Sequence, residues 1–456
     1  MAAPSSSAFE SKVPLSSLAI PHRPPKNSLI QTILFSLYFT LSCIFLHMYQ
    51  CMVQPLRLAP PLRSTVRATN AWVKSAFSKG LVSMTWLFSP SNIVLSFRDE
   101  HGNTLDPRQF VDFKPDGSVD RVRLPMRSIW ISNHQVYTDW LYLWILSYFC
   151  GLESSIYIIL KDSLKWVPIV GLAMQLFDFI FLARSWIKDQ RTLSTHLSKL
   201  ARLSHFDKMP LTLVIFPEGT LVSKDTRPQS KKYADKVGLE DCRNVLLPRS
   251  TGLLYCARTL KKEIDDLMLM DATIGYPGIP PAGYGQSYYT LRSIYMQGVP
   301  PPSVHISITL RRISSSDPDA DATTMAKEGG QMPIGDISKL SQDASPRDLD
   351  PSEAERQMFD SWLLTRWREK DDLMDRFYKD GDFVGGAFVR NKKEAGEYYR
   401  ESEDDTVGGG EGIKTEKGRQ YVCIPIALRS PLEIPQVYAY GLPLIAVWLA
   451  YLWLRR

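Results

Sequence analysis

The residues best suited to chemistry in this sequence are a histidine and an aspartate five positions apart, His134 and Asp139. They follow a β-like run at 128–132 and precede an apolar, helix-like run at 141–149. Five residues turn a helical side chain by about 140°, so the pair could not face one site from mid-helix. With His134 in the turn and Asp139 in the first helical residues, the two can converge as a general base and its orienting group. The positive end of the helix dipole would keep the imidazole neutral.

The eight residues 133–140 also have a simpler interpretation. Asn and Asp side chains commonly cap helices, so Asn133 or Asp139 could do no more than begin the following helix. The motif by itself leaves both interpretations open.

The segments around this motif predict an α/β fold. Apolar strands alternate with helices, which predicts a mainly parallel central sheet flanked by helices. The predicted strands are 128–132, 155–160, 177–182, 211–216, 270–276 and 304–310, and the main helices are 141–149, 190–203, 250–259 and 359–378. Functional groups in such sheets gather in the loops that follow the strands. His134, Arg184 and Glu218 occupy such positions, so we expect them to share one site.

Composition limits the partners and the compartment. The 456 residues include 54 basic and 48 acidic side chains, a net charge of +6. This small surplus does not indicate nucleic-acid binding, but it is compatible with a basic face toward anionic lipid headgroups. The six scattered cysteines form no Cys-x-x-Cys pair, which favours a reducing compartment over a disulfide framework or a zinc site.

Two apolar segments predict membrane attachment. Residues 29–53 lie in a stretch without charged side chains that is long enough to span a bilayer, which takes about 20 residues. A cleaved signal peptide would start nearer the terminus. Residues 434–454 are also free of charged side chains and either span the bilayer or lie in its interface. If both span, the arginines after the first segment place the large domain in the cytoplasm.

Two further regions differ in composition. The basic, amphipathic stretch at 55–95 fits either a helix on the membrane surface or an ordinary core-facing helix. Residues 314–355 contain few large apolar side chains, which predicts a flexible insertion.

Four motifs resemble those of the glycerolipid acyltransferase family, the one named for lysophosphatidate acyltransferases. The first, Asn-His-x-x-x-x-Asp, is matched by Asn133, His134 and Asp139. The others are matched by an apolar strand that ends in Arg at 179–184, by Phe-Pro-Glu-Gly-Thr at 216–220 and by Leu-Leu-Pro at 246–248. Their order and spacing match as well, over about residues 125–280.

The flanking residues resemble one branch, which includes lysocardiolipin-type and lysophosphatidylinositol-type enzymes. The similar segments are 161–168, 233–239, 248–253 and 362–371. Two positions depart from the lysophosphatidate pattern, because Leu221 stands where many of those enzymes have Arg, and Asp178 where many members have Gly. The missing cation disfavours a bare phosphomonoester acceptor and favours a lysophospholipid with a larger headgroup.

The resemblance implies acyl transfer from coenzyme A to a glycerol hydroxyl, with His134 as general base and Asp139 holding its tautomer. The implied substrate-binding residues are Arg184, Glu218, Gly219 and Thr220, and Asn133, Pro217 and Pro248 are expected to be structural. Acyl-CoA is then a co-substrate and a membrane lipid the acceptor, with no metal or cofactor. The alternatives are phosphatidate synthesis from 1-acylglycerol 3-phosphate, an acyl-CoA hydrolase, and a membrane binding protein without catalysis.

These expectations divide the chain into seven regions of an integral membrane protein, located in the endoplasmic reticulum or alternatively in a mitochondrial membrane. They are a disordered tail (1–28), a transmembrane helix (29–53), a basic amphipathic and strand region (54–126), an acyltransferase core (127–313), a flexible insertion (314–355), a charged C-terminal region (356–433) and a second transmembrane helix (434–454).

Overall fold

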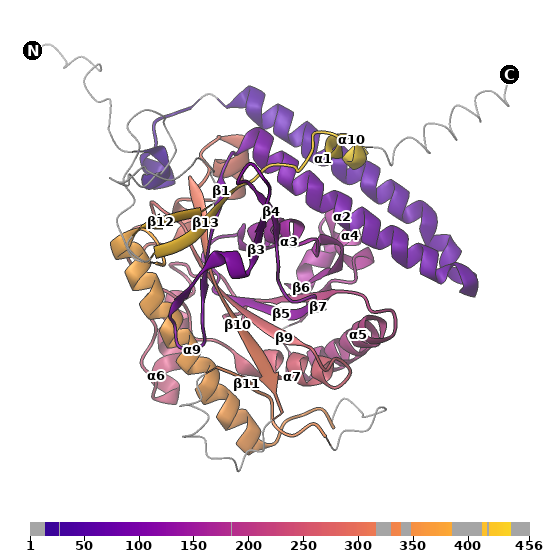
Figure 1. The fold of residues 1–456 in the computed structure, drawn as a ribbon, viewed down its shortest axis with the longest axis vertical. Helices are drawn as coiled ribbons and strands as arrows, with labels where there is room; N and C mark the ends of the chain where they lie inside the picture. The colour runs from indigo at the N-terminus through magenta and orange to yellow at the C-terminus, as the bar shows by residue number, and fades with distance from the viewer. Residues whose placement is uncertain are drawn as a thin grey trace, which may run out of the picture.

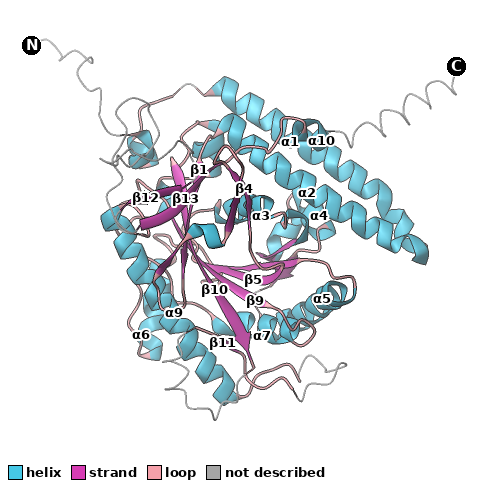
Figure 2. Ribbon diagram, in the orientation of Figure 1, coloured by secondary structure: helices cyan, strands magenta, loops and turns pink. Residues whose placement is uncertain are grey.

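The central feature of the computed structural model is one mixed sheet of 11 strands with helices on both faces (Figure 1, Figure 2). The structure describes residues 14–26, 28–183, 185–315, 330–338, 348–384, 413–416 and 419–438. The predicted α/β class with a largely parallel sheet is confirmed.

The strands are β1 (Asn92–Arg98), β2 (Thr104–Leu105), β3 (Val111–Phe113), β4 (Val119–Val122), β5 (Arg127–Ser132), β6 (Ile156–Lys161), β7 (Ile180–Leu182), β8 (Leu211–Ile215), β9 (Met268–Gly275), β10 (Ser303–Ser314), β11 (Met332–Pro333), β12 (Ile413–Glu416) and β13 (Arg419–Pro425). The α-helices are α1 (Leu29–Val53), α2 (Arg63–Phe88), α3 (Asp139–Cys150), α4 (Val170–Leu176), α5 (Trp186–Phe206), α6 (Arg227–Val237), α7 (Ser250–Lys261), α9 (Glu353–Asp380) and α10 (Glu433–Tyr438).

The strand order is β12-β13-β1-β10-β9-β5-β8-β6-β7, with β2 and β11 on the edges of β1 and β10. From β9 to β7 every pair of neighbours is parallel, so the carboxyl ends of these strands meet at one edge. β10 runs antiparallel to β9, and β13 runs antiparallel to β1. The strands β12 and β13 lie in a region for which the sequence predicted no sheet. β13 pairs with β1, which is more than 300 residues away, and β12 pairs with β13.

The alternation of side chains along β5 separates the two layers of the core. Trp130 packs with α2 and α3 on one face, whereas Ile129 and Ile131 pack with α5, α7 and α9 on the other. Helix α9 begins at a capping box, in which the Ser352 hydroxyl accepts from the Glu355 amide and the Glu355 carboxylate accepts from the Ser352 amide. This cap starts the 28-residue helix that crosses the second face.

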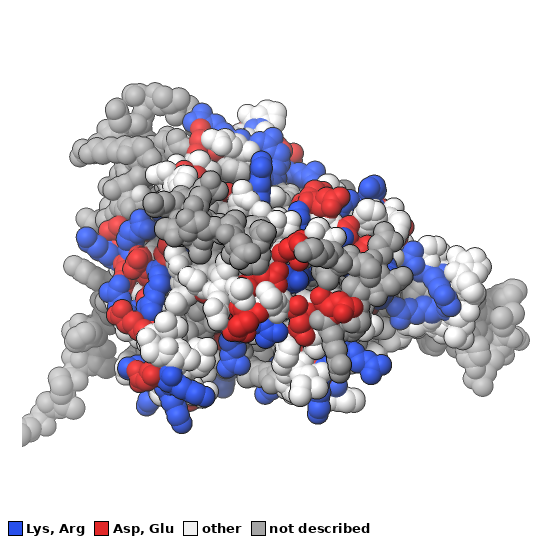
Figure 3. Space-filling view, turned by 90° about the horizontal axis from the view of Figure 1, so that it is seen from below, with Lys and Arg blue, Asp and Glu red and all other residues white. Residues whose placement is uncertain are grey.

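Helix α1 has the predicted bounds 29–53 and, by length and composition, is apolar enough to cross a membrane. Helix α2 packs beside it (Figure 1) and buries Val73, Phe77 and Leu81 against the core, so residues 63–88 of the stretch at 55–95 form a core-facing helix. The second predicted span, 434–454, lies outside the described residues from 439 onward. Acidic and basic side chains are interspersed over the face shown in Figure 3.

Candidate active site

The turn between β5 and α3 brings His134 and Asp139 together. Nδ1 of His134 lies 2.7 Å from Oδ2 of Asp139, whose side chain is fully buried, while the imidazole keeps 19% of its surface exposed. Asp139 is the first residue of α3, as the sequence predicted. The same Oδ2 atom accepts from the amides of Gln135 at 2.7 Å and Val136 at 3.0 Å. The carboxylate therefore closes the turn before α3 and holds the imidazole at once. It does not cap the helix, because the N-cap residue is Thr138 and no side chain accepts a capping hydrogen bond there.

The other carboxylate oxygen of Asp139 accepts a 2.6 Å hydrogen bond from the Tyr276 hydroxyl, at the end of β9. Because the carboxylate is an acceptor for all its partners, the proton between it and His134 resides on Nδ1. In neutral imidazole this leaves a lone pair on Nε2. The His134 ring also stacks on Phe216, with ring centroids 4.4 Å apart and planes inclined by 25°. The ring orientation is fixed from two sides.

Glu218 follows β8 and clamps the backbone behind His134. Its carboxyl group is 2% exposed and accepts from the His134 amide at 3.1 Å and from the Leu246 amide at 3.2 Å. Burial raises the pKa of Glu218 to about 8, against the opposing effect of the two amide donors. The Val222 amide donates to the His134 carbonyl at 3.0 Å, so the segment after β8 holds His134 through both backbone groups.

The remaining motif residues shape the loops beside the histidine. Gly219 is exposed at φ +69°, a conformation that glycine adopts without strain. The carbonyl of buried Pro217 accepts from the Arg249 amide at 2.8 Å, which ties the third motif to the residue after Pro248. Thr220 is half-buried. These four residues therefore converge on the loop next to His134, and exposed Arg249 joins them there.

Asn133 lies behind the site rather than in it. Its side-chain amide donates to the Ile274 carbonyl at 2.9 Å, and its side-chain oxygen accepts from the Ile274 amide at 2.8 Å. This reciprocal pair fastens the motif to β9, so Asn133 does not cap the helix.

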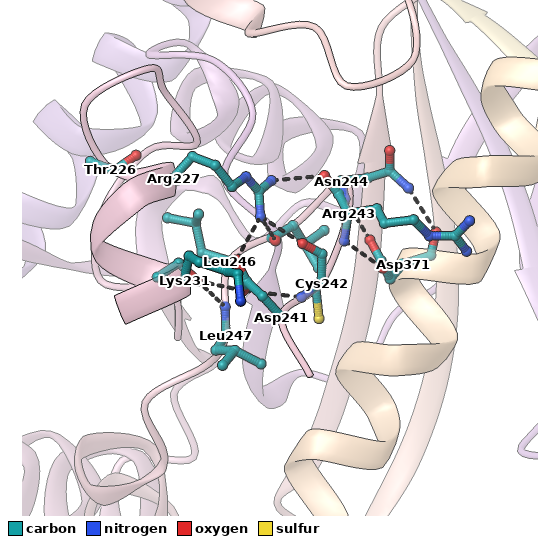
Figure 4. Close-up of polar contacts among 12 residues, drawn as sticks. Thr226, Arg227, Lys231, Asp241, Cys242, Arg243, Asn244, Leu246, Leu247 and Asp371 are labelled. Atoms are coloured by element: carbon teal, nitrogen blue, oxygen red, sulfur yellow. Dashed lines mark hydrogen bonds and ion pairs between the residues drawn. The ribbon is translucent and has the colours of Figure 1, made fainter. Parts of the chain in front are cut away.

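A loop at 241–247 lies beside the same site and is held from two sides, so we call it the braced loop (Figure 4). The Arg227 guanidinium donates to the carbonyls of Cys242 and Val245, both at 2.8 Å, and of Arg243 at 3.0 Å. From the other side, Asp371 of α9 accepts from the amides of Arg243 and Asn244.

The braced loop contacts the motif directly, because the Asn244 carbonyl accepts from the Gln135 side chain at 3.0 Å. Sequence reasoning missed Tyr276, Arg227 and Asp371 as site residues. Tyr276 ends a predicted strand parallel to the one before His134, which was the available signal. Arg227 and Asp371 act on backbone carbonyls and amides, which leave no pattern in the sequence.

The sequence singled out three further positions, Arg184, Leu221 and Asp178. Arg184 lies outside the described residues. Leu221 is 6% exposed and packs in the interior. Asp178 has φ +57° and pairs with Lys199 of α5 at 2.7 Å, so it occupies a left-handed position that explains why glycine suits this site. Among the described residues, no group of three His, Cys, Asp or Glu side chains is arranged to hold a metal.

Known proteins similar to this chain are acyltransferases. The family model described as "Acyltransferase" matches residues 119–276. The 2-acyl-1-lysophosphatidylinositol acyltransferase of Saccharomyces cerevisiae is 32% identical over 76% of this chain and 84% of its own length. Lysocardiolipin acyltransferase 1 of Danio rerio is 29% identical over 56% of this chain and 55% of its own. The Arabidopsis thaliana protein named "Probable 1-acyl-sn-glycerol-3-phosphate acyltransferase 5" is 30% identical over 58% and 57%, respectively.

Proposed function

The chain belongs to the acyltransferase family, and on that basis we propose that it transfers a fatty acyl chain from acyl-CoA to the free hydroxyl of a lysophospholipid of the lysophosphatidylinositol or lysocardiolipin type. The observation that carries this proposal is the 2.7 Å contact between Nδ1 of His134 and Oδ2 of Asp139. A thioester is already activated, so the reaction needs a base for the attacking hydroxyl and no enzyme nucleophile.

In this mechanism His134 accepts the hydroxyl proton on Nε2 as the acceptor oxygen attacks the thioester carbonyl carbon. The new C–O bond forms, and the C–S bond of the tetrahedral intermediate then breaks. The imidazolium returns its proton to the departing coenzyme A thiolate, which leaves the histidine neutral for the next turnover. Asp139 stabilises the imidazolium between the two proton transfers.

The acceptor phosphate requires a cation near this base. The assignment of Arg184 to that role rests on its motif position. We add Arg249, whose Cδ lies 3.6 Å from the point where a Cβ on Gly219 would be. An arginine can bind phosphate through two charge-assisted hydrogen bonds. Gly219 and Thr220 remain proposed substrate contacts, whereas the buried Glu218 is better assigned to positioning His134.

The proposed acceptor class rests on Leu221, which stands where many lysophosphatidate acyltransferases have an arginine. Leu221 is buried and uncharged, so it offers nothing to a bare phosphomonoester. This supports a lysophospholipid with a larger headgroup. The similarity to the Arabidopsis protein keeps 1-acylglycerol 3-phosphate as the second candidate acceptor.

Membrane embedding is proposed from the outer face of α1. Leu29, Ile30 and Leu37 are 64%, 75% and 54% exposed, and such a row of large apolar side chains is favourable in lipid. We place the large domain on the cytoplasmic side of the endoplasmic reticulum membrane, as the arginines after α1 favour.

The test is to present the purified full chain with radiolabelled acyl-CoA and a panel of lysolipids. We expect labelled phospholipid, and coenzyme A release that requires a lysolipid with a headgroup attached to its phosphate. Release of coenzyme A without any acceptor would identify a hydrolase, and labelled phosphatidate as the main product would identify the second candidate. Absence of turnover with every acceptor would leave a binding protein and refute the proposal.

A further inference from the structure

A polar pocket lies between α9 and the strands β1, β9 and β10, on the opposite face of the sheet from α1, α2 and α3. Its volume is about 330 Å³. This is near the lower end of the range for ligand pockets, about 300–1,000 Å³, so it suits a small molecule.

The floor of the pocket is polar because the central strands β9 and β10 place polar side chains on the face under α9 and apolar side chains on the other face. On β9 it is formed by Asp271 and Thr273, and on β10 by Ser307, Thr309 and Arg311. The pairing of Thr309 with Asp271 and of Ser307 with Thr273 gathers these groups on one patch. A strand covered on both faces normally carries apolar residues throughout. Burying charged groups here costs free energy that apolar side chains would avoid, which argues for a use beyond holding α9 in place.

Cations outnumber anions along the buried walls. Arg311, Arg366 and Lys370 are each less than 10% exposed. The opposing acids are Asp271, which pairs with Lys370 and lies 3.5 Å from Arg311, and Glu369, which pairs with Arg366 at 2.9 Å. The walls therefore keep one positive charge in excess.

At the mouth two more arginines approach each other. Arg98 and Arg376 both line the opening, together with Asp99 and Asp372. Burial lowers the pKa of Arg98, and the nearby Arg376 is the next cause. An anion between the two guanidinium groups would relieve this repulsion.

One buried polar atom at the floor, Oγ of Ser307, forms no hydrogen bond within the described part of the chain. Nε of Arg311 and Oδ1 of Asp271 form no hydrogen bond either, but both are held in ion pairs, with Oδ2 of Asp271 at 3.5 Å and with Lys370, respectively. Ser307 is almost completely buried, at 2% exposure. A buried hydroxyl is usually satisfied, so the unpaired Ser307 hydroxyl in the lining of a polar cavity indicates a partner that enters the cavity.

We propose that this pocket is a second ligand site, separate from the acyl-transfer site, and that it binds a small phosphate-bearing molecule. The guanidinium groups of Arg311 and Arg376 would take the phosphate oxygens, and the hydroxyls of Ser307 and Thr309 would complete the contacts. The ligand is either a soluble phosphomonoester or the exposed phosphate of a membrane lipid, and both present the same group.

The experiment is isothermal titration of the full chain in detergent with two probes, glycerol 3-phosphate for the soluble source and dihexanoyl phosphatidate for the lipid source. Binding of either probe that Arg376→Gln weakens and Arg249→Gln leaves unchanged supports the site, and the probe that binds more tightly identifies the source. Arg376→Gln should weaken binding about tenfold, the equivalent of one charge-assisted contact. Lys379→Gln, on the same helix but outside the pocket, should leave the affinity unchanged.

Two further variants separate this site from a merely structural charge cluster and from the acyl-transfer site. Ser307→Ala removes a buried hydroxyl that has no hydrogen-bond partner among the described residues, so it should weaken binding without lowering the thermal unfolding temperature. Arg249→Gln, beside the catalytic loop, should leave the affinity unchanged. No binding of either probe at about 10 mM, far weaker than a specific site requires, would overturn the proposal. So would binding that Arg249→Gln removes and Arg376→Gln retains.

Discussion

The hydroxyl of Tyr276 donates a 2.6 Å hydrogen bond to Oδ1 of Asp139, so a residue at the end of β9 holds the acid that orients His134. Tyr276→Phe removes this donor but leaves the two backbone amides and the imidazole on the other oxygen. We expect kcat to fall about tenfold with little change in KM, since one hydrogen bond to a charged group is worth about 1.5–3 kcal/mol. Steady-state kinetics would measure this, and an unchanged kcat would show that the hydroxyl does not act through Asp139.

Replacing the proposed base should remove most of the turnover. His134→Ala is expected to lower kcat about 10²–10⁴-fold, the usual contribution of general-base catalysis, and to leave the fold intact. His205→Ala, at the exposed end of α5, is the matched control and should keep the rate. Thermal unfolding monitors the fold of both variants. A folded His134→Ala protein that retains most of its rate would refute the assignment.

The buried carboxyl of Glu218 should make stability depend on pH. Its pKa is about 8 in the native protein, against an ordinary value of 4.5, so the native state binds a proton that the unfolded chain has released between these values. The free energy of unfolding therefore falls as pH rises from about 4.5 to about 8, by at most about 1.4 kcal/mol per pH unit for one proton.

Glu218→Gln cannot titrate, so its stability curve should be flatter over that range. The exposed Glu240→Gln variant should reproduce the slope of the unmodified protein. Unfolding by denaturant at pH 5, 6, 7 and 8 compares the three, with pH values chosen to bracket the expected window. Parallel curves for Glu218→Gln and the unmodified protein would contradict the assigned proton.

The contacts of Arg227 with three carbonyls predict that lysine cannot replace it. A lysine keeps the charge but offers a single ammonium group, so Arg227→Lys should loosen the loop at 241–247 and reduce kcat/KM about tenfold. Hydrogen exchange of the loop amides, followed by mass spectrometry, would detect the loosening. Arg191→Lys, on the exposed face of α5, is the control for replacing an arginine with a lysine. Unchanged protection in Arg227→Lys would show that Asp371 alone holds the loop.

The proposed phosphate contact of Arg249 predicts a defect in substrate binding rather than in the chemical step. Arg249→Gln should raise KM for the lysophospholipid about tenfold and change kcat little, because it removes a contact made equally in the ground and transition states. KM for acyl-CoA should stay the same. A rise confined to acyl-CoA would assign Arg249 to the coenzyme A phosphates.

Much of the active-site region was determined by the sequence itself. The spacing of His134 and Asp139, at the end of an apolar run, predicts a strand-to-helix turn because helical geometry forbids convergence in mid-helix. Strands that alternate with helices predict parallel neighbours, so the loops after β5 and β8 had to meet at one edge. The predicted position of Asp139 in the first turn of α3 agrees with the structure.

Tertiary structure alone decided what supports that pair. The Glu218 carboxylate accepts from two backbone amides in the interior. The Tyr276 hydroxyl donates to Asp139, which is 137 residues away in the sequence, and Arg227 donates to backbone carbonyls, which every residue possesses. Such contacts depend on where backbone groups lie in space and not on residue type, so no local pattern encodes them. The polar pocket under α9 also depends on tertiary structure. Polar and apolar side chains alternate along β9 and β10, and the polar ones form a pocket only because the two strands pair and α9 covers that face.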